Sequence, residues 1–257
     1  MARGPSSLLE QLIHRRGLTL WERAAARAQA IPLSELRHLR QRAQQMRSRI
    51  DRVLFIADAR LTLPRIGSNA FHKPLHSDWS WRPELWRGPV HPSGYAAAAT
   101  KQRFGGEATL FHDCRISELT VRQIRNTREA DVAPFGLRMD VFNFDGSFLS
   151  LVIDLPEAAV RGLERRHLVR MIAVVETERR LEIFARLNVR HGPNTEQIVR
   201  ELKLGQGEIV VEFDLAYSNL NEKRVERAWV DLIFEQPSMN QVILRDVNFS
   251  RRPRAEL

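Results

Sequence analysis

Three consecutive residues, His112, Asp113 and Cys114, have side chains that could carry out nucleophilic chemistry, because an imidazole can take the proton of a nearby thiol. In a strand, His112 and Cys114 would point to the same face. A catalytic cysteine also needs an oxyanion site and an electropositive, partly exposed setting, and the sequence displays neither. We therefore interpret Cys114, the only cysteine of the chain, as a small buried apolar residue, and we expect no catalytic residue here.

A second group, His72, His76 and Asp78 with His91 further along, has the side chains of a metal site. Pro74 opposes the helix that would place the two nearer histidines on one face. No HExxH motif or cysteine framework accompanies them. We expect polar loop residues, no metal and no cofactor.

Tryptophans are concentrated between positions 79 and 86. Trp79 and Trp81 would project to the same side of an extended segment, and with Trp86 they could form a platform on which a sugar ring stacks. Arg82, Arg87 or Glu84 could then form hydrogen bonds with the sugar hydroxyls. The interpretation we favour is that the rings pack an irregular segment against the body of the protein, because three exposed tryptophans would form an aggregation-prone patch.

Paired carboxylates, Glu212 with Asp214 and Asp231 with Glu235, lie two or four residues apart and so share a face of a strand. General acid-base catalysis would need one member with a raised pKa. Because these residues alternate with core positions, we expect them to face solvent or the N-terminal arm. The sequence contains no glycine-rich phosphate loop and no serine nucleophile elbow.

An apolar seam with alternating spacings of three and four is predicted near the N-terminus. It consists of Leu36, Leu39, Ala43, Met46, Ile50 and Val53. The flanking positions carry Arg40, Arg42, Arg47 and Arg49 and no acid. A symmetric dimer through this seam would bring like charges together, so we expect these residues to form a contact surface for a different partner.

Residues 6–58 are predicted to be helical. Capping boxes at Ser7–Glu10 and Thr19–Glu22 predict two helix starts. Pro32 would end the second helix, and Ser34 can cap a third.

From residue 108 onward, apolar and polar residues alternate with a period of two, most regularly in 209–217. About ten short strands are predicted, and turn residues separate neighbours. The strands cover 108–114, 117–125, 134–144, 148–155, 167–177, 181–190, 196–204, 209–217, 226–235 and 241–249. We predict an α+β protein, mainly β, with an antiparallel jelly-roll-like β-sandwich preceded by a basic helical arm.

The charge is distributed unevenly along the 257 residues, whose net charge is +9. Residues 1–60 hold 12 arginines against 5 acids, whereas residues 108–257 hold 22 basic and 23 acidic residues. The predicted division is an Arg-rich helical arm at 1–60, a Pro- and Trp-rich connecting segment at 61–107, the sandwich at 108–250, and a basic tail at 251–257.

The longest stretch without charged residues, Gly88–Thr100, contains two prolines and two glycines, so no transmembrane segment is predicted. Arg15-Arg16 is followed almost at once by charged residues instead of the apolar run of an export signal. The cytoplasm is the expected compartment.

Three stretches resemble an uncharacterised bacterial family of unknown function. They are Phe144–Leu151, His191–Asn194 and Asn221–Asp231, and the resemblance covers about the last two-thirds of the chain. It implies no catalytic residue and no cofactor.

The sandwich itself is the expected partner of the arm. Phe142, Phe144, Phe148 and Val152 are apolar residues on a face that should be solvated, and an apolar helix flanked by arginines would cover them. An acidic protein or an anionic membrane surface is the second choice, and nucleic acid is the least favoured.

We predict a binding or scaffold protein instead of an enzyme, with a glycan or another polar ligand as the first choice. One alternative is a carbohydrate- or ester-active enzyme with a carboxylate site at the sandwich edge. Another is a peripheral protein whose Arg-rich helix binds a protein partner or an anionic surface. A deep cleft with two facing carboxyl groups would favour the enzyme.

Overall fold

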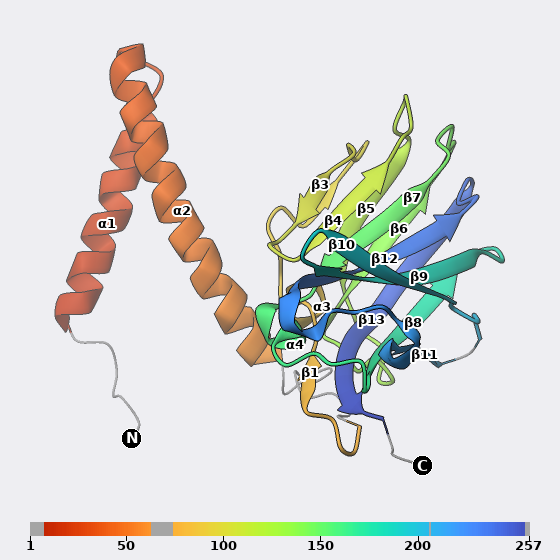
Figure 1. Cartoon of the computed structure of the whole chain (residues 1–257). Coiled ribbons are helices and arrows are strands. Elements are labelled where there is room, and N and C mark those ends of the chain that lie inside the picture. The colour runs from red at the N-terminus through yellow and green to blue at the C-terminus, as the bar shows by residue number, and fades with distance from the viewer. Residues whose placement is uncertain (1–7, 63–73, 206, 255–257) are drawn as a thin grey trace. The chain divides into compact units, whose positions relative to one another are not determined.

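The computed structural model describes residues 8–62, 74–205 and 207–254 (Figure 1). The chain divides at Val53 into two compact units. We call residues 8–53 the helical unit and the remainder the sandwich unit. None of the described helices is long and apolar enough to cross a membrane.

The helical unit contains α1 (Leu8–Arg27) and the first two-thirds of α2 (Leu33–Thr62). The two helices diverge from the turn that joins them (Figure 1). Leu36, Leu39 and Ala43 of the predicted seam are half-buried. Further along α2 the seam is open, since Met46 is 44% exposed and Ile50 is 50% exposed.

The structure corrects the prediction that a helix starts at Thr19. α1 runs without interruption through this residue, whose hydroxyl donates to the carbonyl oxygen of Arg15 at 3.0 Å. A threonine inside a helix forms this bond to the preceding turn in place of capping an amide. Gly17 costs the helix only about 1 kcal/mol, and the helix-forming residues around it outweigh that cost. Ser7 lies outside the described residues.

The sandwich unit has two antiparallel sheets (Figure 1). Sheet A has the strand order β11 (Glu208–Asp214), β8 (His167–Thr177), β13 (Asn240–Pro253), β6 (Phe135–Val141), β5 (Leu119–Arg125) and β2 (Gly94–Tyr95), and β1 (Trp79–Trp81) also pairs with β13. Sheet B has the order β10 (Asn194–Glu201), β9 (Glu182–His191), β12 (Val225–Glu235), β7 (Leu149–Asp154), β4 (Ala108–His112) and β3 (Gln102–Phe104). Short helices lie at α3 (Glu84–Arg87), α4 (Glu157–Val160), η1 (Leu215–Tyr217) and η2 (Glu222–Arg224).

The core lies between the sheets, where alternate residues of each strand point inward. On β9 the inward residues include Ala185 and Leu187, and on β12 they include Leu232, all at most 1% exposed. This alternation confirms the mainly-β, antiparallel sandwich predicted from the sequence, and each of the ten predicted strands is present.

The predicted connecting segment 61–107 contributes to the sandwich unit through its described residues 74–107. It supplies β1 and β2 to sheet A and β3 to sheet B, and Leu85 and Trp86 of α3 are fully buried. Strands of two or three residues are too short to show a period, which is why the sequence pattern missed them.

At the C-terminal end of the chain, β13 continues to Pro253 and buries Arg251, so the last strand includes the start of the predicted basic tail.

The apolar face predicted to receive the arm is not one face. Phe142, Phe144 and Phe148 lie in the loop between β6, in sheet A, and β7, in sheet B, whereas Val152 lies on the outer side of β7. Phe142 is 53% exposed at the end of the sandwich. The predicted strand limits of 134–144 and 148–155 extended both strands into this loop.

Candidate functional site

Two central strands of sheet B, β9 and β12, present a set of polar and aromatic side chains on the outer side of the sandwich. The strands are in register, so three cross-strand pairs form: Trp229 with Asn188, Asp231 with Arg186, and Ile233 with Phe184. These residues point outward because they alternate with core residues such as Leu187 and Leu232. We call these six residues the β9–β12 face.

A connected polar network occupies the middle of this face. Arg186 donates from Nη2 and Nε to Asp231 Oδ2 at 2.7 and 2.9 Å, and Asn188 Nδ2 donates to the same oxygen at 3.1 Å. Gln197 of β10 donates to Asn188 Oδ1 at 3.1 Å. Asp231 is only 4% exposed. These hydrogen bonds hold the charged groups in fixed orientations.

The network is not saturated. Among the described residues, Nη1 of Arg186 and Oδ1 of Asp231 have no hydrogen-bond partner, and the Arg186 side chain is 36% exposed. One donor and one acceptor are therefore free on the same face. A hydroxyl group can accept and donate at once, so it matches this pair.

Aromatic and aliphatic side chains border the network. Trp229 is half-buried, and the guanidinium of Arg227 lies 4.5 Å from the centre of its ring. Phe184 and Ile233 are half-buried on the other side of the network. The face thus combines apolar contact area with fixed polar groups, which is typical of binding sites for small polar molecules.

At the Phe184 end the face continues into a groove of about 430 Å³. Its lining includes Arg180, Glu182, Phe184, Glu235 and Gln236. Glu182 and Glu235 are directly opposite each other in the β9–β12 register, and both are exposed. Two carboxylates therefore flank the groove.

The predicted tryptophan platform is divided between the surface and the core. Trp79 and Trp81 are half-buried and stacked with 6.3 Å between ring centres, and Trp81 also stacks on Phe249 at 5.9 Å. Trp86 is fully buried, and its indole N–H donates to the carbonyl oxygen of Leu244 at 3.0 Å. Because Trp86 has no exposed surface, the three rings do not form a common platform.

The polar residues predicted beside this platform make contacts within the protein. Arg82 is 1% exposed and binds both carboxylate oxygens of Asp246 at 2.9 Å. Burial raises the pKa of Asp246, and the Arg82 cation opposes that effect. The Glu84 carboxylate accepts the amide of Gly106, and its own amide donates to Glu107 at 2.6 Å.

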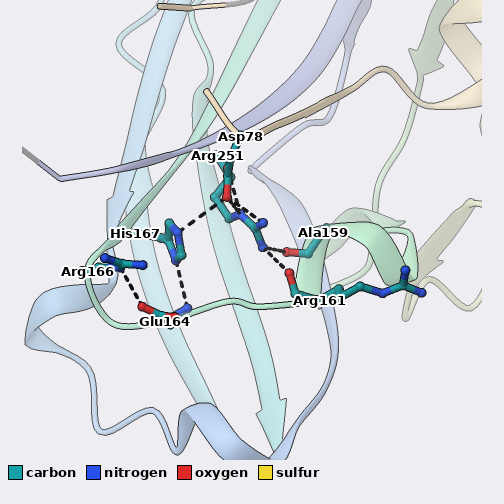
Figure 2. A network of polar contacts seen from close by, with 7 residues as sticks. All are labelled: Asp78, Ala159, Arg161, Glu164, Arg166, His167 and Arg251. Carbon is teal, nitrogen blue, oxygen red and sulfur yellow. Dashed lines mark hydrogen bonds and ion pairs between the residues drawn. The ribbon is translucent and has the colours of Figure 1, made fainter. Parts of the chain in front are cut away.

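A further polar network connects the residue before β1 to the last strand, β13 (Figure 2). Arg251 is 7% exposed and donates to both carboxylate oxygens of Asp78 and to the carbonyl oxygens of Ala159 and Arg161. Burial opposes the ionisation of Asp78, but the hydrogen bonds from Arg251 hold its pKa below the usual value. We call Asp78 and Arg251 the clamp.

His167 completes the clamp region. Its Nδ1 accepts the amide of Glu164 at 2.9 Å, so the proton of the neutral ring is on Nε2, 3.6 Å from Asp78 Oδ2 (Figure 2). Burial lowers the pKa of His167, and the Arg251 cation lowers it further. Asp78 is one of the residues whose side chains could belong to a metal site, and in the structure its carboxylate binds Arg251.

The structure describes no cluster of three or more metal-ligating side chains within residues 8–62, 74–205 and 207–254. His76 is exposed, and His72 lies outside the described residues. His91 is separated from the clamp by the strand β1 and helix α3 in sequence.

His112 and Cys114 are close but do not form a reactive pair. Both nitrogens of His112 are used, Nδ1 by the amide of Cys114 at 3.2 Å and Nε2 by the carbonyl oxygen of Ala98 at 2.9 Å. Burial raises the pKa of the Cys114 thiol, and the charge of Asp145 adds to that shift. The thiol therefore stays protonated near neutral pH.

The other carboxylate pair has structural contacts. Glu212 accepts from Arg170 at 2.7 Å and from Arg252 at 3.3 Å. Partial burial opposes its ionisation, but the hydrogen bonds from Arg170 hold its pKa below the usual value. Asp214 accepts the amide of Ala216 and so ends β11.

Two of the stretches that carry the family resemblance meet at the end of β9, where Nδ1 of His191 accepts the amide of Asn221 at 3.3 Å. The profile of the family of unknown function DUF6478 matches residues 1–257. The chain belongs to this family. No curated protein matches the sequence.

Solved structures with similar arrangements of strands have little sequence in common with this DUF6478 protein. The family 11 carbohydrate-binding module from Clostridium thermocellum is 10% identical, with a TM-score of 0.39 over 59% of this chain and 91% of the module. The CBM22-1 xylan-binding domain from Paenibacillus barcinonensis Xyn10C is 10% identical, with a TM-score of 0.35 over 65% and 96% of the two chains. Tailspike protein 4 of bacteriophage CBA120 is 9% identical, with a TM-score of 0.39 over 56% of this chain, which spans only 19% of the tailspike domain.

Sequence reasoning did not find Arg186, Asn188 or Trp229. Asp231 was noticed, but as one of a pair with Glu235 on its own strand. The available signal was the run Phe184, Arg186, Asn188, in which large or polar residues occupy every outward position of a predicted strand.

Proposed function

We propose that the sandwich unit is a non-catalytic binding module that takes a glycan, or another ligand rich in hydroxyl groups, on the β9–β12 face. The observation that carries the proposal is the juxtaposition of a free donor on Arg186 and a free acceptor on Asp231 with the ring of Trp229. A sugar offers the matching chemistry, hydroxyl groups at the edge of its ring and C–H groups on its faces.

Trp229 would make the stacking contact. Trp229 is half-buried, so part of its surface is open to a ligand. The Arg227 side chain that covers the ring lies on an exposed position, so it can move aside when a ligand binds.

The test measures the binding of the full chain to a panel of neutral and acidic soluble polysaccharides. Affinity electrophoresis and calorimetry are the two methods. Trp229→Ala should abolish binding of any polysaccharide that is retained. Trp79→Ala is the matched control, because Trp79 is a half-buried tryptophan of sheet A. Equal binding by wild type and Trp229→Ala would refute the proposed site, provided that both proteins melt cooperatively.

A second candidate function, a carbohydrate- or ester-active enzyme, is favoured by one observation, the opposed Glu182 and Glu235 of the groove. The release of reducing ends, or of acid, from bound substrates measures this enzymatic activity. Activity that disappears in Glu182→Gln and in Glu235→Gln would establish catalysis, whereas binding without turnover supports the binding module. The cytoplasm remains the proposed compartment, and cell fractionation tests it.

A further inference from the structure

The helical unit carries a strong excess of positive charge. Residues 8–53 contain ten arginines, no lysine and four acids. One ion pair, Arg47 with Asp51 at 3.5 Å, is described there. A charge excess of this size attracts anions at low and moderate salt.

Five of these arginines converge on one groove. The groove has a volume of about 640 Å³ between α1 and α2. Its arginines are Arg15, Arg16, Arg23 and Arg27 from α1 and Arg42 from α2. No acidic side chain lines it. Guanidinium groups bind phosphate oxygens through pairs of N–H donors, so the groove is suited to phosphate groups.

The same groove has an apolar wall of Leu20, Trp21 and Leu39. Leu20 is 55% exposed, and on α2 the exposed Ile50 and Val53 continue the apolar surface beyond the groove. Arginines beside exposed aliphatic residues and a tryptophan are the composition of helices that lie in a membrane interface.

We propose that the helical unit binds the surface of an anionic phospholipid membrane, with headgroup phosphates in the α1–α2 groove and the exposed aliphatic side chains at the acyl boundary. A phospholipid surface offers negative charge and hydrocarbon together, which is what the groove and its surroundings match. DNA offers no continuous hydrocarbon layer for the exposed aliphatic side chains, and a second copy of the helical unit would bring like charges together. The inference is independent of the proposed glycan site, which uses other residues.

The test is sedimentation of the full chain with phosphatidylcholine vesicles that contain or lack phosphatidylglycerol. We expect binding to the anionic vesicles only, with a steep decrease in added salt. Arg23→Gln/Arg42→Gln removes two charges from the groove and should weaken binding about 30-fold. Leu20→Gln/Ile50→Gln removes exposed apolar groups and should weaken it about tenfold or more.

The matched control is Arg115→Gln/Arg200→Gln, which removes the same charge from exposed positions of the sandwich unit and should leave vesicle binding unchanged. Helix content by circular dichroism shows whether each variant keeps α1 and α2. Three results would overturn the proposal: no binding to anionic vesicles, equal weakening by the control, or binding of a DNA duplex with the same sensitivity to Arg23→Gln/Arg42→Gln.

Discussion

Arginines have opposite surroundings in the two units. In the sandwich unit, Arg82, Arg186 and Arg251 each bind an aspartate, at 2.7 to 2.9 Å. Five arginines line the groove of the helical unit, and its lining residues include no acidic side chain. The same side chain is therefore paired with a carboxylate in one unit and, in our proposal, binds an external anion in the other, and composition alone does not distinguish these surroundings.

The largest effect is expected where an arginine is buried with its partner. Arg82→Met would leave Asp246 without its cation, and we expect a loss of about 3 to 5 kcal/mol in the free energy of unfolding. Arg128→Met is the matched control, since Arg128 pairs with Glu176 at an exposed site and should cost less than about 1 kcal/mol. Denaturant unfolding followed by tryptophan fluorescence measures both.

The double variant Arg82→Met/Asp246→Leu sharpens this prediction. It removes both charges, so it should recover most of the lost stability. If Arg82→Met and Arg128→Met lost equal amounts, the contrast between buried and exposed arginines would be wrong.

A smaller effect is expected from the clamp region when the pH changes. The pKa of His167 lies below its ordinary value of 6.5, so below that pH the unfolded chain binds more protons at this residue than the folded chain. Stability should therefore fall as the pH decreases from 7 to 5, by no more than about 1.4 kcal/mol per pH unit from this group.

His167→Asn keeps an acceptor for the amide of Glu164 and has no titrating ring. The wild type should lose more stability than the variant between pH 7 and pH 5. Asp78, whose pKa is lowered from 3.8, contributes only at more acidic pH. If the free energies of unfolding of the wild type and His167→Asn changed equally between pH 7 and pH 5, the lowered pKa assigned to His167 would be wrong.

The smallest effect is expected in the helical unit. Met46→Asp/Ile50→Asp changes two exposed residues, and the main unfolding transition should stay within about 0.5 kcal/mol of the wild type. Docking of the helices on the sandwich, the partner that the sequence favoured, would instead cost several kcal/mol, because carboxylates would enter an apolar contact. Calorimetry distinguishes these results.

The sequence predicted the long strands well because their period of two reports burial directly. β8, for example, was predicted at 167–177 and lies at His167–Thr177. The short strands β1, β2 and β3 were missed, since two or three residues show no period. Thr19 was misjudged because the same hydroxyl can cap an amide or bond to the preceding turn.

The candidate site was less accessible to sequence reasoning. Arg186 and Asp231 are 45 residues apart, and only the β9–β12 register brings them together. The sequence singled out the tryptophans at 79–86, where the structure buries Trp86 and Arg82. Residue type predicted the chemistry, but burial and pairing decided which residues are available for it.

The clamp also has a mechanical consequence. β1 is antiparallel to β13, so the residue that enters β1, Asp78, lies beside the residues that leave β13, and its amide donates to the carbonyl oxygen of Arg251 at 3.0 Å. A force that pulls the chain ends apart would act on β1 and β13 at the same end of their pairing. The bonds between the two strands would then break one after another. Of the contacts between β1 and β13, the Asp78–Arg251 ion pair lies at the end where this force acts, so it would resist the separation of β1 from sheet A.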